Sequence, residues 1–189
     1  GAGKSTLLQV AGLFLTPDLG EVFLRGQSVS QLPSGSRSRY RRQELALVFQ
    51  RPALIPEFTI LENLLLKSQL SNGTVETPHL PLVKKFMLDA GLSGCEALFP
   101  VALSETQRKL VSLIGALVNM PSILLVDEPV AGMDDETAEM VCRWILEANS
   151  NFRTTCVMVS NDRRLLDRSN RVIELREGRV AADFKKQLD

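Results

Sequence analysis

The chain opens with small and basic residues at a spacing suited to phosphate binding. They read Gly1-Ala2-Gly3-Lys4-Ser5-Thr6, the second half of the pattern G-x-x-x-x-G-K-[ST], whose leading glycine would lie before residue 1. A glycine-rich turn that opens a helix points backbone N–H groups and the positive helix end at phosphate oxygens. Lys4 is expected to reach the terminal phosphates, and the Ser5 hydroxyl to bind Mg²⁺. All six residues are therefore candidates for nucleotide binding.

An acidic pair downstream is the candidate for the other half of such a site. Asp127 and Glu128 follow the apolar run at residues 123–126. Carboxylates at the end of a buried strand can hold a metal ion and orient a water molecule for attack on a phosphate. A phosphate loop followed by an acidic strand end predicts a P-loop nucleoside triphosphatase. A turn and a strand end without any ligand is the alternative that these residues leave open.

Composition argues against several other classes of protein. Among 189 residues, Lys and Arg together number 22 and so do Asp and Glu, so no net basic charge attracts nucleic acid. The longest apolar stretch, around residues 110–118, is far shorter than the roughly 20 residues that a membrane-spanning helix needs. Cys95, Cys142 and Cys156 are odd in number and lack metal-ligand spacing, which indicates buried thiols in a reducing compartment.

Strand and helix patterns alternate along most of the chain. We expect helices at 5–15, 136–148 and 163–168, and strands at 21–25, 45–49, 122–126, 155–159, 172–175 and 179–182. Residues 34–39 read as a polar connection into the basic cluster at 37–42. A solvated face is the simpler interpretation of that cluster, and a membrane headgroup or a partner is the alternative. From 59 to 118 the pattern is helical, with a break at 71–81.

This order predicts an α/β fold of the P-loop type, with a parallel sheet core flanked by helices. Residues 1–50 and 121–189 would form the nucleotide-binding core. Residues 51–120 would form an inserted α-helical subdomain.

The order of the motifs resembles the ATP-binding subunit of ABC transporters. After the phosphate loop come Phe49-Gln50, the helical insertion, Leu103-Ser104, residues 123–129, Gly132-Met133-Asp134 and Val159-Ser160-Asn161-Asp162. The resemblance covers essentially the whole chain. The stretch 54–63 is most similar to the branch with lipoprotein-releasing, macrolide-efflux and cell-division subunits. The resemblance implies ATP and Mg²⁺ as ligands, and hydrolysis of ATP to ADP and phosphate.

The resemblance also implies a role for each matching residue. Gln50 would touch the metal ion or the attacking water, a role suited to an amide because it both donates and accepts hydrogen bonds. Asp127 would assist Mg²⁺, and Glu128 would be the general base. Ser104 and Gln107 belong to the signature sequence, which contacts the nucleotide bound to the opposite subunit.

Two positions depart from the family pattern. Glu105 and Thr106 replace two glycines of the signature, which places the charge of Glu105 near a phosphate. At a dielectric of about 20, unit charges roughly 4 Å apart repel by about 4 kcal/mol. A hydrogen bond to a charged group supplies roughly 1.5–3 kcal/mol, so repulsion wins unless Glu105 turns away. Asn161 replaces a histidine that contacts the terminal phosphate; it can donate a hydrogen bond but is never cationic. We therefore expect ATP to bind but to turn over slowly.

Helix capping is the alternative role for the polar residues that precede two predicted helices. Asp134 would lie in a loop that crosses to the partner subunit, or would cap the helix that follows it. Asn161-Asp162 would contact nucleotide through Asn161, or would cap the helix that begins at Arg163. The sequence leaves these alternatives open.

The resemblance implies two kinds of partner. A second ATP-binding subunit, identical or different, would complete a dimer that holds two ATP molecules. Transmembrane subunits would receive its motion at the cytoplasmic face of the inner membrane, where this chain would be peripheral. Apolar residues within 54–66 would line a groove for a short helix of the membrane subunit, and packing within the domain is the alternative explanation for them.

Two other functions fit the same fold. The first is a nucleotide-binding pseudo-ATPase or regulatory subunit. The second is a non-transport ABC protein that acts on nucleic acid, against which the neutral charge and the short helical insertion argue. We therefore expect no nucleic-acid partner.

Overall fold

A computed structural model describes residues 1–72 and 80–186 of the chain. Its centre is a parallel sheet of three strands in the order β3 (Leu45–Val48), β4 (Ile123–Asp127) and β5 (Thr155–Val159). The register pairs Val48 with Val126 and Asp127 with Val159, so the carboxyl ends of the strands meet at one edge. The apolar central strand β4 is almost wholly buried, as parallel strands covered on both faces are. The predicted α/β fold with a parallel sheet is confirmed.

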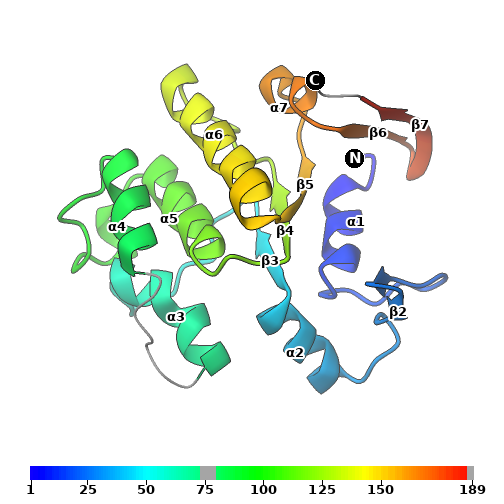
Figure 1. The fold of residues 1–189 in the computed structure, drawn as a ribbon, viewed down its shortest axis with the longest axis horizontal. Coiled ribbons are helices and arrows are strands. Elements are labelled where there is room, and N and C mark those ends of the chain that lie inside the picture. Colours follow the sequence, from blue (N-terminus) through cyan, green and yellow to red (C-terminus); the bar gives the residue numbers. More distant parts are fainter. Residues whose placement is uncertain (73–79, 187–189) are drawn as a thin grey trace.

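Helices cover both faces of this sheet (Figure 1). α1 (Lys4–Ala11) packs against β4 and β5 on one face, and α5 (Glu105–Leu117) and α6 (Asp135–Phe152) lie on the other. α7 (Arg163–Asp167) follows β5. α6 turns a stripe of apolar residues at helical spacing toward the core. Among the residues that the structure describes, none of the helices combines the length and the apolar character needed to span a bilayer.

The chain between β3 and β4 is helical, as the pattern predicts. It contains α3 (Ile60–Asn72), α4 (Leu80–Asp89), the 3₁₀ helix η2 (Pro100–Ala102) and α5. Of the predicted break at 71–81, residues 73–79 lie outside the described residues. Phe86 of α4 packs edge-on against Trp144 of α6, with 5.0 Å between ring centroids. One cluster of buried side chains runs through the sheet, α6 and this helical part.

Many of the apolar residues within 54–66 belong to this core. Ile60, Leu64 and Leu65 are buried, and Leu54 and Leu61 pack against the same cluster with part of their surface exposed. Packing within the domain therefore explains the buried residues. A docked partner helix would have to use the half-exposed ones.

Two antiparallel hairpins complete the described fold. β1 (Phe23–Leu24) pairs with β2 (Gln27–Ser28), and β6 (Arg171–Arg176) pairs with β7 (Arg179–Lys185). The sequence pattern does not predict β2, because its two residues are polar and have little strand preference. The turn of the second hairpin lies beside the phosphate loop, since a Cβ built on Gly3 would be 3.9 Å from the Cα of Gly178.

Several predictions of local structure are wrong. The helix predicted at 136–148 continues to Phe152, and of the strand predicted at 21–25 only Phe23–Leu24 is a strand. The helix after the phosphate loop ends at Ala11 and not at residue 15. Gly12 allows the chain to turn tightly against β4, where a Cβ would come within 3.1 Å of Leu125 Cδ1, and the buried Leu13 follows with a φ of 61°. The predicted polar connection at 34–39 is instead part of a helix, α2 (Ser34–Gln43).

Long-range contacts of the basic cluster explain why α2 forms. Arg41 donates a hydrogen bond of 2.7 Å to the Leu13 carbonyl oxygen and lies 5.0 Å from the centroid of the Phe14 ring. Local helix propensity does not reveal such tertiary contacts. Arg41 therefore binds this chain itself, whereas Arg39 and Arg42 are exposed and fit the solvated interpretation of the cluster.

The three cysteines differ in burial. Cys142 is buried, and Cys95 and Cys156 are half-buried free thiols. Burial raises the pKa of the Cys156 thiol to about 11, so it stays protonated at neutral pH. The prediction of buried thiols therefore holds fully only for Cys142.

Candidate nucleotide-binding site

The phosphate loop ends in a helix start prepared for an anion. Gly3 precedes α1 with a φ of +85°, a left-handed conformation that glycine adopts without strain. Within the described residues, no side chain caps the first turn of α1, and no acidic residue lies in that turn. Its N–H groups and the positive end of the helix are therefore left to a ligand. Lys4 is half-buried at this end, and Ser5 and Thr6 are exposed.

The acidic pair lies at the carboxyl end of the central strand, at the edge of the sheet. Asp127 is the last residue of β4 and is 8% exposed, and its Oδ1 is buried without a hydrogen-bond partner in the described structure. An unpaired carboxylate oxygen is costly to bury, and a cation is the partner that suits its charge. Glu128 leaves the strand with a φ of 51°, and its N–H donates to the Val159 carbonyl oxygen at 2.8 Å.

Glu128 lies within electrostatic reach of the phosphate loop. Burial raises the pKa of its carboxyl, and the negative charges of Asp127 and Asp162 add to the rise. The charge of Lys4 and a hydrogen bond from the Ser160 hydroxyl lower this pKa without cancelling the rise. A carboxyl with a raised pKa is the better proton acceptor. The structure thus places the predicted base within electrostatic range of the phosphate-loop lysine.

Gln50 joins the acidic pair at the same edge. It follows β3, the strand next to β4, and it is exposed. A small pocket between the ends of β3 and β4 and the side of α5 is lined by Gln50, Lys109, Asp127 and Glu128, among others. An amide at this place is next to both carboxylates, as a contact with their ligand requires.

The signature residues Ser104 and Gln107 bind each other. The Ser104 hydroxyl accepts from the Gln107 N–H at 3.2 Å, and Gln107 Oε1 accepts from the Ser104 N–H at 2.9 Å, which makes a capping box at the start of α5. Among the described residues, no hydrogen bond or ion pair joins either of them to the phosphate loop. Their contact with a nucleotide bound to a second subunit stays a prediction.

Glu105 turns along its own helix. Its carboxylate pairs with Lys109 Nζ at 3.2 Å, and Lys109 also donates to the Ala131 carbonyl oxygen at 3.1 Å. The Glu105 side chain is 72% exposed and that of Lys109 only 19%, so a mostly buried cation meets a solvated anion. The pair offsets part of the charge of Glu105. Lys109 also holds the loop that follows Glu128.

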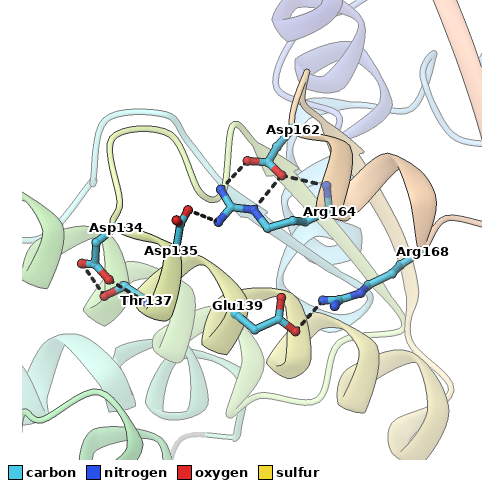
Figure 2. Close-up of polar contacts among 7 residues, drawn as sticks. All are labelled: Asp134, Asp135, Thr137, Glu139, Asp162, Arg164 and Arg168. Carbon is cyan, nitrogen blue, oxygen red and sulfur yellow. Dashed lines mark hydrogen bonds and ion pairs between the residues drawn. The ribbon is translucent and has the colours of Figure 1, made fainter.

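The two aspartates that precede helices act as caps. Asp134 accepts from the Thr137 N–H at 2.9 Å at the start of α6, and Asp162 accepts from the Arg164 N–H at 2.9 Å at the start of α7 (Figure 2). Asn161 is exposed, and within the described residues its side chain makes no hydrogen bond. Capping therefore explains Asp134 and Asp162, and it leaves the Asn161 amide available to a ligand.

The sequence alone does not predict a role for three side chains near the site. Ser160 lowers the pKa of Glu128, Lys109 lines the pocket, and Arg164 pairs with Asp162. For two of these side chains, the sequence contains a pattern that could have indicated their place. Ser160 directly follows the strand next to β4, and Lys109 follows Glu105 at the four-residue spacing of a helical ion pair. The contact of Arg164 with a second helix has no such signal.

A parallel sheet whose central strand ends in two carboxylates, beside a Gly-Lys-Ser-Thr helix start, defines a P-loop nucleotide-binding domain. The family model described as "ABC transporter" matches residues 1–131 of the chain. The chain therefore belongs to the ABC transporter family, and it is an ATP-binding subunit of that family.

Known relatives of the chain include proteins of one branch of the family. The lipoprotein-releasing system ATP-binding protein LolD of Xanthomonas campestris pv. campestris (strain 8004) is 38% identical over 180 residues, which cover 95% of this chain and 75% of that protein. LolD of Nitrobacter hamburgensis is 34% identical over 180 residues, 95% of this chain and 77% of that protein. These similarities support the lipoprotein-releasing branch.

The fold also matches solved structures. The dimeric structure of MJ0796, a bacterial ABC transporter cassette, is similar with a TM-score of 0.89 at 28% identity, and the match covers 97% of this chain and 81% of that chain. A post-hydrolysis state of MJ0796 bound to ADP and Pi is similar to the same extent.

Proposed function

We propose that this subunit binds ATP with Mg²⁺ and hydrolyses it slowly, as one of two ATP-binding subunits on the cytoplasmic face of a membrane complex. The observation that carries the proposal is the acidic pair Asp127 and Glu128 at the carboxyl edge of the parallel sheet, with Lys4 within electrostatic range of Glu128. Lys4 acts on the charge of Glu128, and Asp127 Oδ1 is buried without a protein partner in the described structure. A strand end without any ligand does not account for that oxygen.

The residues at this edge fit Mg²⁺. Ser5, Gln50 and Asp127 offer a hydroxyl, an amide and a carboxylate oxygen, which are the hard ligands that Mg²⁺ prefers. The buried Asp127 Oδ1 is suited to the cation or to a water molecule on it. When bound, Mg²⁺ neutralises charge that develops on the phosphate oxygens.

The residues around the acidic pair have different roles in the reaction. The backbone N–H groups at the start of α1 and the Lys4 ammonium hold the phosphates. Glu128 accepts a proton from the water that attacks the terminal phosphate, for which its raised pKa is favourable. The Ser160 hydroxyl, which lowers the pKa of the Glu128 carboxyl, helps to orient that carboxylate, and Gln50 orients the water.

The start of α5 acts on ATP held by the second subunit. Ser104, Gln107 and the positive end of the helix face those phosphates in the dimer. Glu105 adds a negative charge at this place, and Asn161 brings no positive charge, so charge in the transition state is less stabilised and hydrolysis is slow. In support, MJ0796 forms a dimer in the structures similar to this chain.

The remaining parts connect the site to a membrane complex. We assign residues 1–50 and 121–189 to the ATP-binding core, and residues 51–120 to a helical subdomain that transmits motion to transmembrane subunits. The relatives named as ATP-binding proteins of a lipoprotein-releasing system support this assignment. The balance of 22 basic and 22 acidic residues does not favour nucleic acid as a partner.

A subunit that binds ATP without hydrolysing it is the second candidate. Two observations favour it: the charge of Glu105 at the start of α5, and the lack of a cationic residue at Asn161. The triple variant Glu105→Gly, Thr106→Gly, Asn161→His distinguishes the two. A change from no measurable turnover to ordinary turnover favours the second candidate.

The test is made on the complete gene product, expressed and reconstituted with the membrane subunits encoded beside it. We expect ATP hydrolysis well below that of ordinary transporters, and its loss in Glu128→Gln with ATP binding retained. Turnover at the ordinary rate, abolished by Glu128→Gln, would rule out the slow step. No uptake of adenine nucleotide with Mg²⁺ in calorimetry would overturn the whole proposal.

A further inference from the structure

Arg164 forms the centre of a polar network between α6 and α7 (Figure 2). Its Nε and Nη2 donate to the two carboxylate oxygens of Asp162 at 2.9 and 2.6 Å. Its Nη1 donates to Asp135 Oδ1 at 3.0 Å. One guanidinium thus bridges a residue at the start of α7 and a residue in the first turn of α6. A planar group with several fixed donors can hold two carboxylates at once.

The two bridged residues end loops that both begin at the nucleotide site. Asp162 follows Asn161, the predicted phosphate contact, and its N–H donates to the Ser160 hydroxyl oxygen at 3.0 Å, beside the end of β5 that pairs with β4. Asp135 follows Asp134, which closes the loop that leaves β4 at Glu128. The Arg164 bridge therefore joins the ends of the loops 128–134 and 160–162. These loops begin at Glu128, the predicted base, and at Ser160 beside it.

Neither helix needs this bridge in order to start. Asp134 caps α6 through the Thr137 N–H and hydroxyl, each at 2.9 Å. Asp162 caps α7 through a backbone N–H, a contact that does not involve the guanidinium. What the Arg164 side chain adds is the connection between the two helix starts, together with a positive charge that offsets Asp162 beside Glu128.

We propose that Arg164 is a positioning residue that ties the loop at 160–162 to the loop at 128–134, so that Asn161 and Glu128 keep one arrangement relative to each other. The proposal rests on the proposed function, since it concerns how the ATP site is held. Arg164 acts through Asp162 and Asp135 and does not itself touch nucleotide.

The chain offers a matched control one turn further along α7. Arg168 Nη1 pairs with Glu139 Oε1 at 2.8 Å and also joins α7 to α6 (Figure 2). The exposures are similar, with 31% for the Arg164 side chain and 40% for that of Arg168. Arg168 lies at the end of α7, and Glu139 lies beyond the first turn of α6, so this pair links the same helices without holding either loop.

The experiment compares Arg164→Gln, Arg164→Lys and Arg168→Gln in the full complex with its membrane subunits. Steady-state kinetics gives kcat and KM for ATP, and hydrogen exchange gives the protection of 128–134 and 160–162. We expect Arg164→Gln to lower kcat about tenfold with KM changed by less than about twofold, and to raise exchange in both loops. Arg164→Lys keeps the positive charge but loses the planar guanidinium that binds two carboxylates. It should therefore retain part of the kcat and part of the exchange protection.

Equal kinetics and equal exchange in Arg164→Gln and Arg168→Gln would overturn the proposal, since both variants lose one α6–α7 link. If Arg164→Gln does not fold, Asp135→Ala removes only the exposed arm of the bridge and should raise exchange at 128–134. No rise there would also overturn the proposal. A complex that binds ATP without hydrolysing it would contradict the proposed turnover, whereas the exchange measurements would still decide the role of Arg164.

Discussion

The carboxyl edge of the parallel sheet and the start of α5 differ in whether their polar groups have partners within the described chain. At the sheet edge, Asp127 has a buried oxygen that no described residue satisfies, and the first turn of α1 has no side-chain cap. At the start of α5, Ser104 and Gln107 cap each other, and Glu105 pairs with Lys109. The first region is arranged for a ligand, because its own chain leaves it incomplete. The second is already satisfied within its own helix.

Under the proposed function, this difference separates nucleotide binding from hydrolysis stimulated by the second subunit. Holding a nucleotide depends on the phosphate loop and the acidic pair, which keep the residue types that phosphate and Mg²⁺ require. Acting on the nucleotide of a second subunit depends on the start of α5, where Glu105 and Thr106 replace glycines. We therefore expect binding and stimulated hydrolysis to be under separate control, and variants in each region to have separate effects.

The largest effect is expected at the sheet edge. Lys4→Ala should weaken binding of MgATP about 100-fold, because a charged hydrogen bond contributes roughly 1.5–3 kcal/mol and about 1.4 kcal/mol is tenfold in affinity. Calorimetry on the full-length subunit measures this. Lys85→Ala is the control, since Lys85 is exposed and pairs with Glu147 at 2.7 Å. Equal affinities of the two variants for ATP would contradict the phosphate site.

A smaller effect is expected at the start of α5. The double variant Glu105→Gly, Thr106→Gly should raise ATP turnover of the reconstituted complex about tenfold, because it removes a negative charge from the transition state of the opposite site. The affinity of the isolated subunit for ATP should not change. A changed affinity with constant turnover would show that the two regions are not separate in the proposed way.

The smallest effect concerns Lys109. Lys109→Gln should lower turnover about threefold, because an ion pair with one exposed partner contributes roughly 0.2–1 kcal/mol. Gln retains a donor for the Ala131 carbonyl oxygen, so the change addresses mainly the charge of Glu105. In the Glu105→Gly background the same substitution should have no effect on turnover. A threefold loss in both backgrounds would mean that Lys109 acts on the loop alone.

The sequence predicts the nucleotide edge well because its signals are local. Asp127 and Glu128 end an apolar strand, and Lys4 follows a glycine at a helix start. The edge forms because parallel neighbours align their carboxyl ends, a consequence of topology that the alternation of strands and helices already implies. The roles of the individual site residues stay predictions: residues 1–6, Gln50, Ser104, Gln107, Asp127, Glu128 and Asn161.

What the sequence does not predict depends on contacts between distant residues. α2 contains mostly polar residues and has none buried, yet Arg41 anchors it to the turn after α1. The early end of α1 comes from the fit of Gly12 against Leu125. Arg164 contacts Asp135 across 29 positions of the chain, and no pattern of spacing marks such a pair. Each of these features follows from packing, which local propensity does not encode.

The packing of Phe86 against Trp144 makes the fluorescence of the tryptophan sensitive to the position of α4 relative to α6. Trp144 is the single tryptophan of the chain, it is fully buried on α6, and its indole N–H donates to Asp89 of α4 at 3.4 Å. A shift of the helical part relative to α6 must change what surrounds this indole. Its fluorescence therefore records whether ATP moves the two parts against each other, without any label added to the protein.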